Sequence, residues 1–429
     1  TALLATAQQI KKRNELNDQL AKLEAELARA RKATQAEKDS QKKKPLTEAE
    51  RKLSARKKDL EKQRGVLEQA IPRAMVMKER TEVRPTFIMK RGRYDDPGEE
   101  VTRNTPEFFP AMKKKGEIAS RSDLAEWFVD RRNPLTARVA VNRFWQQFFG
   151  VGLVKTSEDL GTQGELPSHP ELLDYLTVSF IESGWDIKAL IKQIVLSKTY
   201  RQSSMASPEQ FKKDPENRLL ARGSRFRLDA EMIRDQILAT SGLLVSTLYG
   251  KSVKPPQPDG LWKAVTMIGE RFKADTGAAI YRRSLYTYWK RGMPPPQMTI
   301  LNAPIRDACI ARRERTNTPS QALLLLNESE YVKAARSLAQ KVIARNIKPE
   351  QQIELAYETV TSKLPDKTEL AILSELVEDL QKRYGENPAL AEEICRGITL
   401  KNAGEKGRLA AWTMLISAVY NLDITKTRE

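Results

Sequence analysis

The first seventy residues carry leucines at the spacing of a coiled coil. The leucines of one set are 4, 3 and 4 residues apart, and those of a second set recur every seven residues. The two sets are Leu16, Leu20, Leu23 and Leu27, then Leu46, Leu53, Leu60 and Leu67. Residues at these spacings share one face of an α-helix and form the seam between two packed helices. Pro45 and Thr47 separate the sets and mark a new helix start, so we predict an antiparallel coiled-coil hairpin over residues 1–70.

Residues that begin and end helices recur along the rest of the chain. Asn133, His169 and Thr318 each precede a proline, and a capping residue followed by proline is typical of a helix start. Gly150 and Gly242 follow runs of apolar residues at helical spacing, where glycine commonly ends a helix. These signals predict a multi-helical protein.

The predicted fold is therefore mainly α, with a few short strands. Residues 71–120 hold several prolines, a DDPG turn and short β-prone runs, which indicate an extended connector with short strands. One more strand is predicted over Ser284 to Trp289. A mainly helical domain is expected over residues 121–429, with a sub-boundary near residues 250–280.

The chain is strongly basic. It has 74 Lys and Arg against 56 Asp and Glu, a net charge of +18. Of these, 18 basic and 11 acidic residues lie in the predicted hairpin. A basic excess favours an anionic partner such as nucleic acid or acidic polysaccharide, although a solvated basic surface explains the charge equally well. Nucleic acid is disfavoured because the sequence holds no recognised nucleic-acid-binding module.

Few residues are available for metal or cofactor chemistry. His169 is the single histidine, and Cys309 and Cys395 are the two cysteines. The sequence has no HExxH, CxxCH, GxGxxG or Walker motif, so we predict no metal site and no cofactor bound by this chain. We expect the cysteines to be buried and unpaired, with one disulfide between them as the alternative. No apolar run reaches the 18 residues that a transmembrane helix requires. Because the chain opens on Thr1 within a helical pattern, we expect it to be part of a longer protein.

Several arginines lie beside carboxylates and polar residues in the predicted helices. Such a set usually forms buried ion pairs that hold helices in register. The alternative is a pocket in which guanidinium groups bind sulfate, phosphate or carboxylate. If these side chains converge on an open cleft, a ligand site is favoured. If they bury one another, a scaffold role is favoured. The residues predicted to bind a ligand are Arg138, Asn142, Trp145, Arg234 and Arg315.

The sequence completes no catalytic motif, and a non-catalytic role is favoured. His169 is a candidate general base, although its place before Pro170 favours a capping role. Two of the four carboxylates Asp159, Glu171, Asp174 and Glu231 could form a pair that hydrolyses a glycoside, which would require a separation of about 5 to 10 Å. Asp159 and Glu231 are the catalytic candidates among them.

Five segments together resemble a domain of unknown function at the C-terminus of planctomycete cytochrome-c-associated proteins. The resemblance runs from about Ile71 to the end of the chain, and the leading hairpin is similar to a variable helical insertion that precedes this domain. The segments are RSDLAEWFVDRRNPLTARVAVNRFWQQFFGVGLVKTSEDLG, PSHPELLDYLTVSFIESGWDIKALIKQIVLSKTYRQSS, DPENRLLARGSRFRLDAEMIRDQIL, RRSLYTYWKR and RRERTNTPSQALLLLN.

The resemblance implies an extracytoplasmic protein, in which haem c would lie only on an upstream or partner segment. The family has no established catalytic residues that could be assigned to positions of this sequence. The function expected first is an interaction or scaffold module that binds a partner protein or an anionic glycan. The alternatives are an enzyme or binding module acting on a sulfated polysaccharide and, third, a basic nucleic-acid-binding protein.

Overall fold

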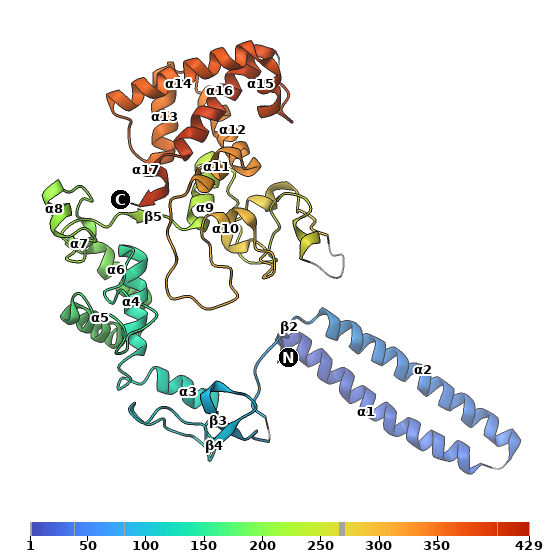
Figure 1. Ribbon diagram of the computed structural model, residues 1–429. Coiled ribbons are helices and arrows are strands. Elements are labelled where there is room, and N and C mark those ends of the chain that lie inside the picture. Colours follow the sequence, from blue (N-terminus) through green and yellow to red (C-terminus); the bar gives the residue numbers. More distant parts are fainter. Residues whose placement is uncertain (1, 38, 81, 266–270, 401, 429) are drawn as a thin grey trace. The chain divides into compact units, whose positions relative to one another are not determined.

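The computed structural model describes residues 2–37, 39–80, 82–265, 271–400 and 402–428 (Figure 1). The protein is mainly helical with a few short strands, which confirms the predicted fold class. It divides into two compact units, Thr1–Ala125 and Glu126–Glu429.

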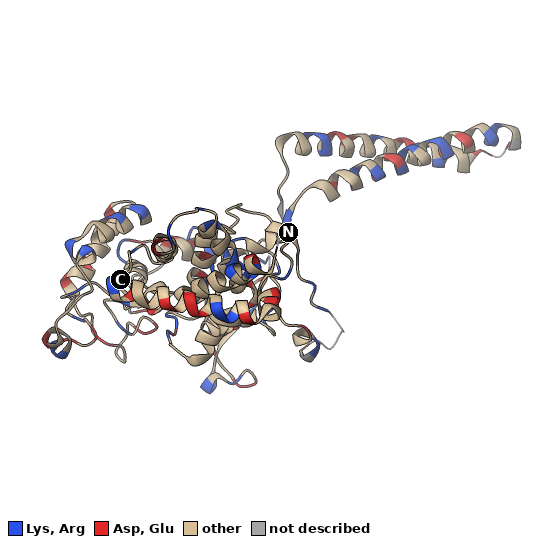
Figure 2. Ribbon diagram, turned by 90° about the horizontal axis from the view of Figure 1, so that it is seen from above, with Lys and Arg blue, Asp and Glu red and all other residues tan. Residues whose placement is uncertain are grey.

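The first unit begins with the predicted hairpin of two packed helices, α1 (Ala7–Ala36) and α2 (Ser40–Ala70). Its core consists of the predicted leucines: Leu16, Leu20, Leu23, Leu27 and Leu60 are buried, with Leu53 and Leu67 packed beside them. Ion pairs such as Lys57–Glu24, at 2.7 Å, link the two helices. Lysines, arginines and carboxylates are interspersed along both (Figure 2).

The predicted start of the second hairpin helix was wrong. Helix α2 begins at Ser40, and Pro45 lies inside it. Asp39 caps the helix, because its Oδ1 accepts a hydrogen bond from the N–H of Gln41 at 2.9 Å. Proline at the sixth helical residue removes the hydrogen bond that its N–H would have donated to the carbonyl oxygen of Gln41, so only one bond of the second turn is lost.

Short antiparallel strand pairs complete the first unit. Strand β1 (Ala2–Leu3) pairs with β2 (Arg73–Ala74) at the open end of the hairpin. In the predicted connector, β3 (Thr86–Met89) pairs with β4 (Pro97–Val101), and the 3₁₀ turn η1 (Lys90–Gly92) follows β3. The next helix, α3 (Arg121–Phe128), crosses the boundary between the units in sequence.

The second unit is built from helices, with a long connection between α9 and α10 whose described residues form only short 3₁₀ turns and isolated bridges. Its helices are α4 (Thr136–Phe149), α5 (Pro170–Glu182), α6 (Ile187–Leu196), α7 (Lys198–Arg201), α8 (Pro208–Lys213), α9 (Ala230–Ser241), α10 (Pro296–Ile300), α11 (Pro319–Asn327), α12 (Ser329–Ile343), α13 (Pro349–Thr361), α14 (Lys367–Glu386), α15 (Pro388–Ile394), α16 (Ala403–Tyr420) and α17 (Asp423–Lys426). The 3₁₀ turns are η2 (Leu261–Ala264), η3 (Gly277–Tyr281) and η4 (Ser284–Tyr286). Strand β5 (Phe226–Arg227) pairs antiparallel with β6 (Thr427–Arg428), close to the end of the chain.

One hydrophobic core of this unit lies among α4, α5 and α6. Trp145 and Phe149 stack in it with ring centroids 4.0 Å apart. Helix α4 begins two residues later than the sequence predicts, because Asn133 Oδ1 accepts from the N–H of Leu135 and places its cap before the helix. The helix ends as predicted at Gly150, whose φ of 80° suits glycine.

The larger core lies among α9 and helices α11 to α16. Helix α12 packs against α16 in its centre, where small residues such as Ala334 and Ala410 are fully buried and let the helices approach closely. The strand predicted over Ser284 to Trp289 was wrong, since this segment begins with the turn η4. The N–H and the hydroxyl of Ser284 both donate to Asp235 Oδ1 at 2.7 Å, which stabilises the turn.

The two cysteines occupy different environments. Cys395 is buried beside α16, whereas Cys309 is exposed, which corrects the expectation that both are buried. Both are free thiols in the part of the chain that the structure describes. Among the described helices, each is too short or too polar to cross a bilayer.

Candidate functional site

A cleft with four basic residues in its lining lies where α4 ends, α9 begins and the loop between α10 and α11 passes. Its volume is about 420 Å³, within the range of pockets that hold small ligands. We call it the arginine cleft. It is lined by Gln146, Gln147, Gly150, Val151, Lys155, Asp229, Pro304, Ile310, Ala311, Arg312, Arg313 and Arg315.

Two hydrogen bonds fix the loop against the end of α4. Arg315 Nη1 donates to the carbonyl oxygen of Gly150 at 2.8 Å. Gln146 Nε2 donates to the carbonyl oxygen of Ala311 at 3.2 Å. A cation at the C-terminal end of a helix is favourable, because the last carbonyl groups lack partners within the helix and carry partial negative charge. The loop thus presents its arginines to the cleft from a defined position.

The start of α9 supplies carboxylates that pair with the arginines of the cleft. Arg313 binds Glu231 through two hydrogen bonds, Nη1 to Oε2 at 2.5 Å and Nη2 to Oε1 at 3.2 Å. Burial lowers the pKa of Arg313, but its hydrogen bond to Glu231 and the charge of that residue outweigh burial and raise the pKa overall. The charge of Arg313 is therefore already balanced by Glu231.

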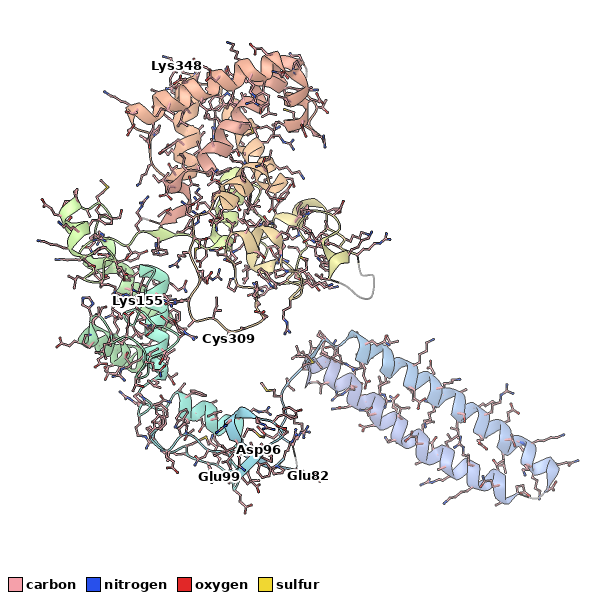
Figure 3. All side chains as sticks on the ribbon, viewed as in Figure 1. Glu82, Asp96, Glu99, Lys155, Cys309 and Lys348 are labelled. Atoms are coloured by element: carbon pink, nitrogen blue, oxygen red, sulfur yellow. The ribbon has the colours of Figure 1, made fainter. Side chains whose placement is uncertain are left out.

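Lys155 and Arg312 form exposed ion pairs at the cleft. Lys155, on the segment after α4 (Figure 3), binds Glu216 with Nζ and Oε2 2.8 Å apart. Arg312 binds Glu158, with Nη2 and Oε1 2.9 Å apart. Pairs as exposed as these contribute at most about 1 kcal/mol. Their cations can exchange a glutamate for another anion at low cost.

Arg315 is the least compensated cation of the cleft. Its Nε lies 3.8 Å from Asp229 Oδ1, and Asp229 also faces Arg313 at 3.7 Å. Among the described residues no acceptor lies within hydrogen-bonding distance of this buried Nε. Burial lowers the pKa of Arg315; Asp229 opposes the shift, and the positive charge of Arg313 adds to it. The guanidinium is thus held in a place that favours an additional anion.

More cations surround Phe226, next to the cleft. The guanidinium carbons of Arg315 and Arg428 lie 4.5 and 5.7 Å from the centre of its ring. Burial lowers the pKa of Arg428, and also those of neighbouring Arg227 and Lys426. The excess of partly buried positive charge therefore extends beyond the cleft itself.

Three of the predicted ligand residues support the first core instead of lining the cleft. Arg138 pairs with Asp174 at 2.6 Å and donates to the carbonyl oxygen of Pro134 at 2.7 Å. Asn142 is buried and exchanges two hydrogen bonds with the backbone of Val154, at 2.9 and 3.0 Å. Trp145 is buried against Phe149.

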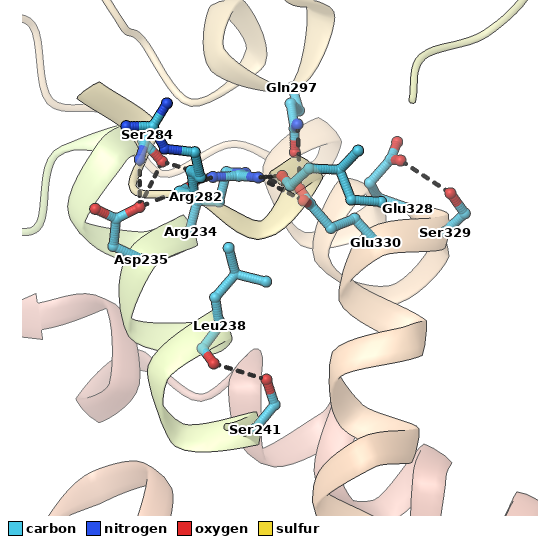
Figure 4. A network of polar contacts seen from close by, with 11 residues as sticks. Arg234, Asp235, Leu238, Ser241, Arg282, Ser284, Gln297, Glu328, Ser329 and Glu330 are labelled. Carbon is cyan, nitrogen blue, oxygen red and sulfur yellow. Dashed lines mark hydrogen bonds and ion pairs between the residues drawn. The ribbon is translucent and has the colours of Figure 1, made fainter. Parts of the chain in front are cut away.

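Arg234 lies in a separate buried network (Figure 4). It binds Glu330 with two hydrogen bonds and donates to the carbonyl oxygens of Ile280 and Arg282. Its side chain has no exposed surface. Of the predicted ligand residues, the structure therefore brings Arg315 to the cleft and places Arg234 in the core.

The candidate catalytic residues are dispersed among local contacts. His169 occupies the N-cap position of α5 as predicted, but its side chain makes no capping hydrogen bond to the helix; its Nδ1 lies 3.1 Å from Ser168 Oγ. Asp159 Oδ1 accepts from the N–H of Gly161 at 2.7 Å. Glu231 binds Arg313, and none of the three belongs to the cleft lining given above. Within the described parts of the chain, no three His, Cys, Asp or Glu side chains gather as a metal site.

Sequence reasoning missed Asp229 and Lys155 as cleft residues. Asp229 precedes α9 and serves as its N-cap residue. An acidic residue just before a predicted helix is a recognisable signal, although it normally indicates capping. Lys155 lies in an irregular segment, where no periodic pattern gives its direction.

A comparison with known protein families identifies the family of this chain. The family described as "PSD1: Protein of unknown function (DUF1553)" matches residues 120–377, which is more than half of the chain. The chain belongs to this family. All the residues that line the arginine cleft fall inside the matched region. No curated protein and no solved structure matches the chain.

Proposed function

We propose that the second unit is a non-catalytic interaction module that binds an anionic polysaccharide. In this proposal the sulfate or carboxylate groups of the polysaccharide occupy the arginine cleft. The observation that carries it is the position of Arg315, which is largely buried, shares Asp229 with Arg313 and retains an Nε without an acceptor among the described residues. Guanidinium groups bind sulfate and carboxylate through paired hydrogen bonds, so an anion beside Arg315 would offset the cost of burying it.

The cleft also offers cations that can exchange partners. Arg312 and Lys155 hold glutamates in exposed pairs. Such pairs are weak in water, so a polyanion can replace Glu158 or Glu216 with little loss. A chain with repeated anionic groups fits this arrangement better than an isolated ion, because it can contact Arg315 and these outer cations together.

A binding role is favoured over hydrolysis. Glycoside hydrolysis requires one carboxyl group that donates a proton and a second that acts as nucleophile or base. Both oxygens of Glu231 accept hydrogen bonds from Arg313, and Asp229 faces two arginines. Neither carboxyl group is presented to a leaving-group oxygen.

The proposal also includes the location of the protein and its neighbouring segments. The resemblance of the chain's motifs to planctomycete cytochrome-c-associated proteins supports work outside the cytoplasm. In that setting haem c would be carried by an upstream or partner segment, and the module would hold a polysaccharide near it. Binding of a partner protein at the cleft is the competing form of the same scaffold role.

A panel of polymers tests the proposal. Binding of the full chain would be measured by isothermal titration against sulfated dextran, unsulfated dextran of equal length and duplex DNA, at about 0.15 M salt. We expect saturable binding of sulfated dextran alone. Equal binding of unsulfated dextran, or none of either, would overturn the proposal. Binding of DNA with a steep salt dependence and no sulfated-dextran preference would replace it with the nucleic-acid function.

A further inference from the structure

A second cavity lies within the C-terminal helices and is separate from the arginine cleft. It is formed by α13, α14, α15 and α16 and has a volume of about 430 Å³. We call it the C-terminal cavity. It is lined by Pro349, Gln352, Gln381, Tyr384, Gly385, Pro388, Ala403, Gly404, Gly407, Arg408 and Trp412. Most of these residues follow residue 377, where the family match ends.

The cavity has an aromatic wall with an unused donor. Trp412 is 1% exposed, and among the described residues its indole N–H finds no acceptor. Tyr384 is also buried, and burial raises the pKa of its hydroxyl, which keeps that group a neutral donor. A buried donor without an acceptor costs about 1–3 kcal/mol. The indole N–H of Trp412 is covered by neighbouring atoms and has almost no accessible surface, so a ligand in the cavity does not reach it.

The positive end of a helix faces the same space. Helix α16 has 18 residues, and Ala403, Gly404 and Gly407 of its first turns line the cavity. The first N–H groups of a helix have no acceptor within the helix and favour an anion. Asn402 accepts from the N–H of Glu405 at 2.9 Å, which satisfies one of them. Gly404 and Gly407 have no side chains that could cover the remaining N–H groups at the start of α16.

Arg408 adds a full positive charge. Its Nη2 lies 3.4 Å from Oε1 of the buried Gln352. Gln352 Nε2 in turn donates to the carbonyl oxygen of Val342 at 3.4 Å, so the amide that contacts Arg408 is held in place. No ion pair of Arg408 occurs within the described residues. Its guanidinium is therefore available to a carboxylate.

From these features we infer that the C-terminal cavity binds a small cyclic carboxylate. The carboxylate group contacts Arg408 and the start of α16, and the ring lies against the accessible edge of Tyr384. Aromatic side chains stack on both sugar and aromatic rings, so a uronic acid and an aromatic acid are the two sources of this chemistry. This site is independent of the proposed polysaccharide function, and the failure of either leaves the other standing.

The test uses the full chain and two matched pairs of probes. Binding of galacturonate and benzoate would be measured by isothermal titration beside their neutral counterparts, galactose and benzyl alcohol. We expect saturable binding of at least one acid at millimolar concentration or below, and binding at least tenfold weaker for its neutral counterpart. Preference for galacturonate identifies a sugar acid, and preference for benzoate an aromatic acid. Binding of neither acid, or equal binding of acid and counterpart, would overturn the inference.

Variants locate the site. Arg408→Gln is expected to weaken acid binding at least tenfold, whereas Arg345→Gln, an exposed arginine outside the cavity lining, should leave it unchanged. Trp412→Phe keeps an aromatic ring and removes only the covered N–H, so it should leave acid binding unchanged. Because Trp412 lies in the core, circular dichroism is used to check that this variant folds. If Trp412→Phe does not fold, the variant of the exposed Arg408 alone decides the test. Unchanged binding in Arg408→Gln contradicts the site.

Discussion

Arg234 on α9 and Glu330 on α12 form a buried, two-fold hydrogen-bonded ion pair. Arg234 Nε donates to Glu330 Oε2 at 2.8 Å, and Nη2 donates to Oε1 at 2.5 Å. The two side chains are 0% and 3% exposed. Gln297 Nε2 also donates to Glu330, at 3.3 Å. This pair joins helices that are 96 residues apart in sequence, so it fixes their register within the larger core.

Arg234→Met should destabilise the second unit by about 3–5 kcal/mol, because it leaves the charge of Glu330 buried without its partner. Urea denaturation would measure the loss. The double variant Arg234→Met and Glu330→Met removes both charges and should recover most of the stability. A single variant as stable as the wild type, or a double variant less stable than the single one, would contradict this account.

Asn142→Ala should cost about 2–4 kcal/mol, because the N–H and carbonyl of Val154 then lose a buried hydrogen-bond partner. Thermal unfolding would measure the change. Gln193→Ala is the control: its amide contacts the hydroxyl of Tyr175 at an exposed position, and its loss should change stability by less than about 0.5 kcal/mol. Similar losses in both variants would mean that Asn142 does not have the structural role assigned to it.

Glu328→Gln should raise the melting temperature at pH 7. Burial raises the pKa of Glu328; the hydrogen bond from the backbone N–H of Glu330 opposes this shift, the negative charge of Glu330 adds to it, and the pKa is raised overall. An acid whose folded pKa exceeds its unfolded value is destabilising when ionised, and the penalty disappears as pH falls through the folded pKa to the unfolded value near about 4.3.

The difference between Glu328→Gln and wild type should therefore shrink towards zero at about pH 4. Differential scanning calorimetry across this range measures it. The exposed Glu375→Gln on α14 is the control and should show no such trend. A difference that is absent at pH 7, or that grows on acidification, would refute the burial of Glu328 as a source of instability.

Helices with strong local signals could be predicted from the sequence. The leucine spacing gave the hairpin seam, and Thr318 with Pro319 marked the start of α11 where the structure has it. Gly150 and Gly242 end α4 and α9 with positive φ angles of 80° and 72°. Such features depend on neighbours within a few residues, and periodicity or capping chemistry reveals them.

Features set by distant residues could not be predicted in this way. The segment after Arg283 has the composition of a strand, but its contact with Asp235, 49 residues away, turns it into η4. The candidate site shows the same limit. Arg138 and Arg315 look alike in sequence, yet one pairs with Asp174 on the next helix and the other reaches Gly150, 165 residues away. Which arginine meets a free anion depends on tertiary contacts that periodicity does not encode.

The most direct test of the proposed function compares two arginines with similar local contacts. Arg315 and Arg138 each donate to a backbone carbonyl and face an aspartate, but only Arg315 belongs to the arginine cleft lining. The affinity of the full chain for sulfated dextran would be measured for Arg315→Gln and Arg138→Gln, with circular dichroism to confirm folding. Because a hydrogen bond to a charged group contributes about 1.5–3 kcal/mol, we expect roughly tenfold to hundredfold weaker binding for Arg315→Gln and unchanged binding for Arg138→Gln. Equal affinity in the two variants would contradict binding at the cleft.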